Sequence, residues 1–152
     1  MGDAGAGLFT VGVFKDVASA QKGLDALKQA GFPAESLTIV AKESAEVAAL
    51  IAQALGATGD RMELTPIGPA VGRGPLLAAL QGQAQDLASL GLARTMRHVG
   101  FQTHDGRIFE TLTGRGGVLV AIRSDPRAAD ALAILHSYGG GNAAIGAWSG
   151  RV

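Results

Sequence analysis

The segment Gly116-Gly117-Val118-Leu119-Val120-Ala121-Ile122-Arg123 is the most concentrated apolar run of the chain, and Ser124-Asp125-Pro126 follows it directly. A short apolar run bounded by turn-forming residues is typical of a buried strand rather than a helix. The run is apolar on both of its faces, which predicts a strand at the centre of a sheet. Asp125 is of a type that caps helices and Pro126 suits a first helical position, so we expect a helix to begin there.

A second strand is predicted at residues 8–14, with Val11 and Val13 on one face and Phe14 on the other. Asp16 is then placed to cap a helix over residues 17–30. Its inward residues recur at helical spacing: Ala20, Leu24, Leu27 and Ala30. A C-terminal glycine, Gly31, ends this helix, and residues 36–41 form a further strand.

The end of the chain repeats this strand-helix-strand plan without a gap. The aligned pairs are Phe14 with Ile122, Lys15 with Arg123, Ala20 with Ala128, Leu24 with Leu132, Leu27 with Leu135, Gly31 with Gly139 and Leu37 with Ile145. Two β-α-β units commonly combine in the split, ferredoxin-like arrangement. The sequence therefore predicts an α+β fold with an antiparallel sheet, in which the first strands of the two units are central neighbours and the second strands are the edges.

We expect a single domain over residues 1–152. The first unit covers residues 8–41, a helical insertion rich in Gly and Pro covers residues 42–115, and the second unit covers residues 116–148. The insertion is expected to hold helices at 47–55 (capped by Ser44 and ended by Gly56), 76–80, 84–97 and 103–113, with a polar connection at 58–65. Because an exposed apolar sheet face is a liability, either this insertion or a second protomer must cover the second face of the central strand.

Composition narrows the function classes. The chain has 13 Lys plus Arg and 13 Asp plus Glu, so its formal net charge is zero. This balance disfavours a nucleic-acid partner and does little to prevent self-association. There is no cysteine, which excludes disulfides and thiolate chemistry and agrees with a cytoplasmic location. No apolar run reaches the roughly 20 residues of a transmembrane helix, and residues 1–7 lack the features of a signal peptide.

Three segments resemble the bacterial general stress protein family, also called the heat-induced stress protein domain. They are Val11-Gly12-Val13-Phe14 with Gly31-Phe32-Pro33, then Pro66-Ile67-Gly68-Pro69 with Gly74-Pro75-Leu76-Leu77-Ala78-Ala79-Leu80, then Phe109-Glu110 with Gly116-Gly117-Val118-Leu119-Val120-Ala121. They cover most of the chain in the family's order. The resemblance implies a link to stress response and brings no catalytic residue. The middle segment is shorter and more polar than is usual in the family, which favours a form that is not inserted in a membrane.

One group of residues is a candidate anion site. Arg94 and Arg97 share a helix face, and the full set is Arg94, Arg97, His98, His104 and Arg107, with Arg115 nearby. Arginine forks match phosphate and carboxylate groups. The alternative is a solvated helix face, or ion pairs with Asp86 and Glu110.

The remaining candidate residues are a pair of histidines with an aspartate, and the single tryptophan. His98, His104 and Asp105 are spaced wrongly for one helical face, so we expect no metal site. Trp148 is expected either in the core or, as we prefer, as an interface anchor.

The leading prediction is a non-enzymatic, stress-associated protein that acts through self-association, as a homodimer or larger, or through partner binding, with no cofactor. One alternative is a protein that binds a small anionic ligand in a pocket between the sheet and the insertion. The other is weak peripheral membrane association through the glycine-rich middle.

Overall fold

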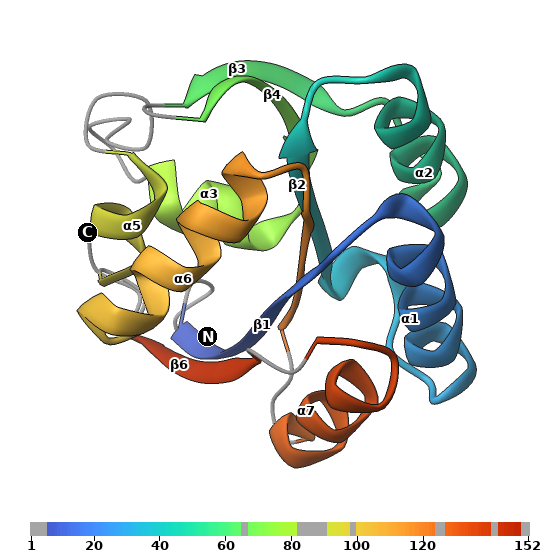
Figure 1. The fold of residues 1–152 in the computed structure, drawn as a ribbon. Coiled ribbons are helices and arrows are strands. Elements are labelled where there is room, and N and C mark those ends of the chain that lie inside the picture. The colour runs from blue at the N-terminus through green and yellow to red at the C-terminus, as the bar shows by residue number, and fades with distance from the viewer. Residues whose placement is uncertain are drawn as a thin grey trace.

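The computed structural model describes residues 6–64, 67–81, 91–97, 100–123, 127–140 and 143–149. They form an α+β fold in which one antiparallel sheet carries helices on both faces (Figure 1). The strands are β1 (Ala6–Phe14), β2 (Leu37–Lys42), β3 (Asp60–Leu64), β4 (Gly68–Arg73), β5 (Val118–Arg123) and β6 (Ala144–Ser149). The helices are α1 (Val17–Gln29), α2 (Ala45–Leu55), α3 (Pro75–Gln81), α5 (Leu92–Met96), α6 (Thr103–Gly114) and α7 (Ala128–Ser137), with a 3-10 turn η1 (Ala34–Ser36).

The central position predicted for β5 is confirmed. The strand order is β3-β4-β2-β5-β1-β6, so β5 lies between β1 and β2 and pairs antiparallel with both. In the β1–β5 ladder, Val11 is opposite Ala121 and Phe14 is opposite Val118. The expectation that the second strands are edges holds for β6 alone, because β4 pairs with the outer side of β2.

The insertion is not purely helical, and this part of the prediction is wrong. Residues expected as a polar connection and a Gly/Pro-rich segment form β3 and β4, which pair as a hairpin and extend the sheet beyond β2. The close pairing of β4 with β2 requires a glycine at position 72, because a Cβ atom on Gly72 would lie 2.9 Å from the Ile39 carbonyl oxygen of β2. Pro69 cannot donate from its nitrogen, but its carbonyl oxygen accepts from the Glu43 backbone N–H at 3.1 Å.

The two faces of the sheet are covered by different helices (Figure 1). Val118, Val120 and Ile122 of β5 pack in the cluster that includes α1, α2 and α7. Leu119 and Ala121, which point the other way, pack with α3, α5 and α6 of the insertion. The insertion, rather than a second protomer, therefore keeps the second face of β5 out of water.

Most helix ends follow the sequence signals. Asp16 Oδ1 accepts from the Ser19 N–H at 2.8 Å and so caps α1, as predicted. Ser44 Oγ accepts from the Val47 N–H at 3.1 Å and caps α2. The start of α7 differs from the prediction: the helix begins at Ala128, with Arg127 in the cap position. The residues expected to begin it, 125 and 126, lie outside the described residues.

Candidate functional site

The arginine and histidine residues predicted to bind an anion lie on two packed helices. Arg94 is on α5 and Arg97 is its C-cap, while His104 and Arg107 are in the first half of α6. All four side chains are exposed, and none of them lines the hollows described below. His98 lies outside the described residues. The structure therefore places the four described residues on two packed helices, with their side chains exposed.

The close approach of α5 and α6 depends on a glycine and a carboxylate. A Cβ atom at Gly106 would lie 2.6 Å from the Ala93 carbonyl oxygen, so a larger residue would push the helices apart. Glu110 Oε2 accepts from the Ala93 N–H at 3.1 Å and satisfies a free donor at the start of α5. Glu110 thus caps a helix instead of pairing with an arginine. The other expected partner, Asp86, lies outside the described residues.

The described part of the glycine-rich middle packs its large apolar side chains inside the protein. Its large side chains, Ile67, Leu76, Leu77 and Leu80, are buried in the cluster under α3 and α6. Within the described ranges, no helix is long and apolar enough to cross a bilayer. Across the same residues, no group of three or more His, Asp and Glu side chains is arranged to hold a metal ion.

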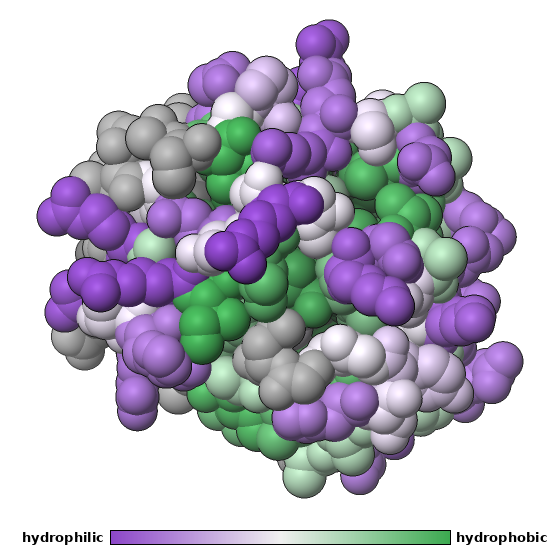
Figure 2. Space-filling model, viewed as in Figure 1, coloured by the Kyte–Doolittle hydropathy of each residue, from purple (hydrophilic) through white to green (hydrophobic). Residues whose placement is uncertain are grey.

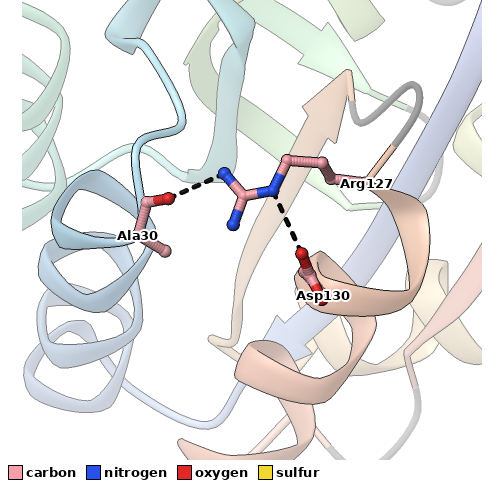
Figure 3. A network of polar contacts seen from close by, with 3 residues as sticks. All are labelled: Ala30, Arg127 and Asp130. Atoms are coloured by element: carbon pink, nitrogen blue, oxygen red, sulfur yellow. Dashed lines mark hydrogen bonds and ion pairs between the residues drawn. The ribbon is translucent and has the colours of Figure 1, made fainter.

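Arg127 is the centre of a polar network between the two repeated units (Figure 3). Its Nη1 donates to the Ala30 carbonyl oxygen at 2.7 Å, and its Nε pairs with Asp130 Oδ2 at 3.0 Å. The guanidinium carbon also lies 4.5 Å from the centroid of the Phe32 ring. These contacts tie the start of α7 to the carboxyl end of α1, where a cation is favourable. The role of Arg127 is structural.

Two hollows lie around the start of α2. One, of about 420 Å³, is lined by Lys42 together with the carboxylates of Asp16, Glu43 and Glu46. The backbone and side-chain hydrogen bonds from Ser19 lower the pKa of Asp16. The other hollow, of about 640 Å³, runs between α2 and the β3–β4 hairpin, and its lining includes four alanines and the Glu43–Arg61 ion pair. The first hollow therefore has more acidic than basic groups in its lining, and the second contains a matched ion pair.

The third hollow, of about 320 Å³, lies where the ends of β1, α6 and α7 meet. Its lining is Val13, Phe14, Lys15, Leu112, Arg115, Gly117 and Gly139. Lys15 and Arg115 are the charged members, and both are exposed cations. The sequence prediction placed Arg115 near the anion group and did not include Lys15. Lys15 could have been found from its alignment with Arg123, which sets a basic residue at the end of each central strand.

Strand β6 forms one edge of the described sheet, since β1 is its neighbour on one side and no described strand lies on the other. Its sequence, Ala-Ile-Gly-Ala-Trp-Ser, carries no charge. Ile145 is 40% exposed, and among the described residues the other exposed large hydrophobic side chain is Tyr138. Trp148 stands opposite Gly7 in the β1–β6 ladder, and its side chain lies outside what the structure describes. The opposite edge, β3, carries Asp60, Arg61 and Glu63.

No family model, curated protein or solved structure matches this chain.

Proposed function

We propose that this protein is a non-enzymatic binding protein that acts by associating with further copies of itself through the edge strand β6. The observation that carries the proposal is the contrast between the two edges of the sheet. An edge strand presents unpaired backbone N–H and C=O groups, and proteins commonly protect it with charged side chains. Edge β3 has this protection in Asp60, Arg61 and Glu63, whereas β6 has no charged residue.

A second copy of the chain is the partner that fits β6 best. Antiparallel pairing of β6 with β6 of another copy places the same surface on both sides of a two-fold axis, as is usual in homodimers. Identical surfaces meet without repulsion when the strand is uncharged, and the net charge of zero adds no long-range repulsion. The exposed side chain of Ile145 becomes buried in such a contact.

The insertion covers the second face of β5, so that face gives no support for a dimer. Association is therefore assigned to the edge of the sheet. The non-enzymatic role is supported by polar groups with structural tasks: Asp16 and Glu110 cap helices, and Arg127 joins α1 to α7. The stress-associated part is supported by the sequence resemblance alone, and a cytoplasmic location agrees with a chain that has no cysteine.

The single tryptophan provides a direct test because it lies on β6. Light scattering after size exclusion, from about 1 to 200 μM protein, measures the mass, and tryptophan fluorescence over the same range reports burial of Trp148. We expect the mass to rise with concentration and the emission to shift to shorter wavelength. Ile145→Lys, which places a charge on the edge, is expected to abolish both changes.

The matched control is Tyr138→Lys, since Tyr138 is a comparably exposed hydrophobic residue, at 43%, outside β6. It should associate like the wild type. A wild-type protein that is monomeric at every concentration refutes the proposal. So does an Ile145→Lys variant that keeps both the wild-type melting temperature and the wild-type mass.

A further inference from the structure

We propose that the hollow between the ends of β1, α6 and α7 binds a small organic anion that carries a short apolar group, with Lys15 and Arg115 as its charge partners. This site differs from the arginine and histidine group on α5 and α6, and it does not depend on self-association. Its volume of about 320 Å³ is at the lower end of the roughly 300–1,000 Å³ typical of small-molecule sites.

The described lining of this hollow is cationic. Of the described residues that line it, none is acidic. The side chains of Lys15 and Arg115 make no hydrogen bond or ion pair with any described residue. Lys42, in the neighbouring hollow, lies among three carboxylates instead. Two cations that line one hollow without an anion repel each other, and a bound anion would relieve that repulsion.

The partial charge at a helix end explains the position of only one of the two cations. Arg115 is the C-cap of α6, where a positive charge is favourable in its own right. Lys15 directly precedes Asp16, the N-cap of α1, where the partial charge of the helix is positive and a cation is unfavourable. Asp16 is the nearest carboxylate in sequence, and its pKa is lowered mainly by hydrogen bonds from Ser19 and also by the charge of Lys15. Its carboxylate accepts from the Ser19 N–H and does not line this hollow, so Lys15 is the cation that remains on the hollow side.

The repeated unit offers an internal comparison. Gly139, at the rim of this hollow, aligns with Gly31, which follows α1. Beside Gly31, the space is occupied by Arg127, whose charge is matched by the Ala30 carbonyl and Asp130. Beside Gly139, Lys15 and Arg115 line the corresponding hollow, and no described residue of its lining is acidic. The two ends of the repeat thus differ, because an internal ion pair lies at one and two exposed cations line the other.

The walls of the hollow are apolar. Leu112 is the partly exposed apolar side chain of its lining, and Val13 and Phe14 belong to the core beneath it. A Cβ atom at Gly117 would lie 2.6 Å from Val13 Cγ1, so this glycine keeps the wall free of a further side chain. Figure 2 shows hydrophobic side chains at the surface over β1, between α6 and α7, with hydrophilic ones on either side. Apolar walls with cations at the mouth suit a carboxylate on a short hydrocarbon chain better than a fully hydrated inorganic anion.

The test is isothermal titration of the full chain with hexanoate, with inorganic phosphate and with neutral 1-hexanol. We expect hexanoate to bind more tightly than phosphate, 1-hexanol not to bind, and added salt to weaken the binding of hexanoate. Lys15→Gln and Arg115→Gln should each weaken hexanoate about tenfold, the loss expected for one charged hydrogen bond at a partly exposed site. Both side chains are exposed, so the variants should keep their fold.

Lys42→Gln is the matched control, because it removes an exposed lysine from the neighbouring hollow, and it should bind hexanoate like the wild type. The proposal is overturned if hexanoate does not bind at millimolar concentration, if 1-hexanol binds equally well, or if either Gln variant at Lys15 or Arg115 binds like the wild type. Binding of phosphate without hexanoate overturns the assignment of an apolar group to the ligand. None of these results bears on β6, so they leave the self-association proposal to its own test.

Discussion

Replacing Arg127 by alanine tests whether the joint between the two repeated units contributes to stability. The substitution removes the donor to the Ala30 carbonyl at 2.7 Å, the pair with Asp130 at 3.0 Å and the contact with the Phe32 ring at 4.5 Å. A charged hydrogen bond contributes about 1.5 kcal/mol, a cation–π contact about 0.5 kcal/mol and an exposed ion pair about 0.3 kcal/mol. The Arg127 side chain is 41% exposed, so solvent reduces these values. We expect a total loss of about 1.5 kcal/mol.

Urea unfolding followed by circular dichroism measures the loss, and a domain of this length should also melt about 3–6 °C lower. Asp130→Ala separates the contributions, because it removes only the exposed ion pair and should cost about 0.3 kcal/mol. Arg127→Lys keeps the charge but loses the planar fork, so roughly half of the stability loss should remain. The reasoning is refuted if Arg127→Ala is within 0.3 kcal/mol of the wild type, where about 1.5 kcal/mol is expected. It is also refuted if Asp130→Ala costs as much as Arg127→Ala.

Three further predictions concern single positions. Thr113 Oγ1 is buried without a hydrogen-bond partner, so Thr113→Val should raise the free energy of unfolding by about 1 kcal/mol. Thr95→Val should lower it, because it removes a hydroxyl that shares its proton between the Gly91 carbonyl oxygen at 2.9 Å and the Leu92 carbonyl oxygen at 3.2 Å. Equal effects of the two variants in urea unfolding would contradict this. The pKa of Asp16 is lowered in the folded state, so the stabilising effect of its charge is present above its ordinary pKa of 3.8 and is lost as the pH falls through the folded-state value. Asp16→Asn keeps the cap, so its melting temperature should be lower than that of the wild type at pH 7 and equal to that of the wild type at pH 2. The same difference in melting temperature at both pH values would be evidence against a role for the charge. Gly74→Ala should destabilise the protein far more than Gly56→Ala. Both glycines have positive φ, but only at Gly74 would the Cβ atom collide with a backbone carbonyl oxygen. The melting temperatures of the two variants test this order.

The fold could be predicted where a helix-capping residue and a periodic pattern of apolar residues indicated the same element. Helix α1 has both, in the Asp16 cap and the recurring inward leucines, and its bounds came out within one residue. The adjacency of β1 and β5 followed from the repeat, because two aligned strand-helix-strand units have few ways to share one sheet. These features depend on residues close in sequence or on an internal alignment.

The β3–β4 hairpin was missed because its strand character comes from tertiary contacts. Gly68, Pro69 and Gly72 have poor strand propensity, and β4 forms because β2 supplies a partner that glycine can approach closely. The Lys15–Arg115 hollow was missed for a related reason. The two residues are far apart in sequence, and only the meeting of β1 with the end of α6 places them around one cavity.

The insertion determines where this protein is able to interact. Its middle is fixed to the sheet by a buried polar contact, in which Thr38 Oγ1 of β2 accepts from the Leu76 N–H of α3 at 3.0 Å. Gly74 just before it leaves no room for a side chain, so α3 is held against β2 in one position. The insertion then buries the face of β5 that would otherwise have been the natural surface for a second protomer. The proposed self-association is consequently assigned to the uncharged edge at β6. The proposed ligand binding is assigned to the place where the end of α6 meets β1, because two exposed cations line a hollow there and no described residue of its lining is acidic.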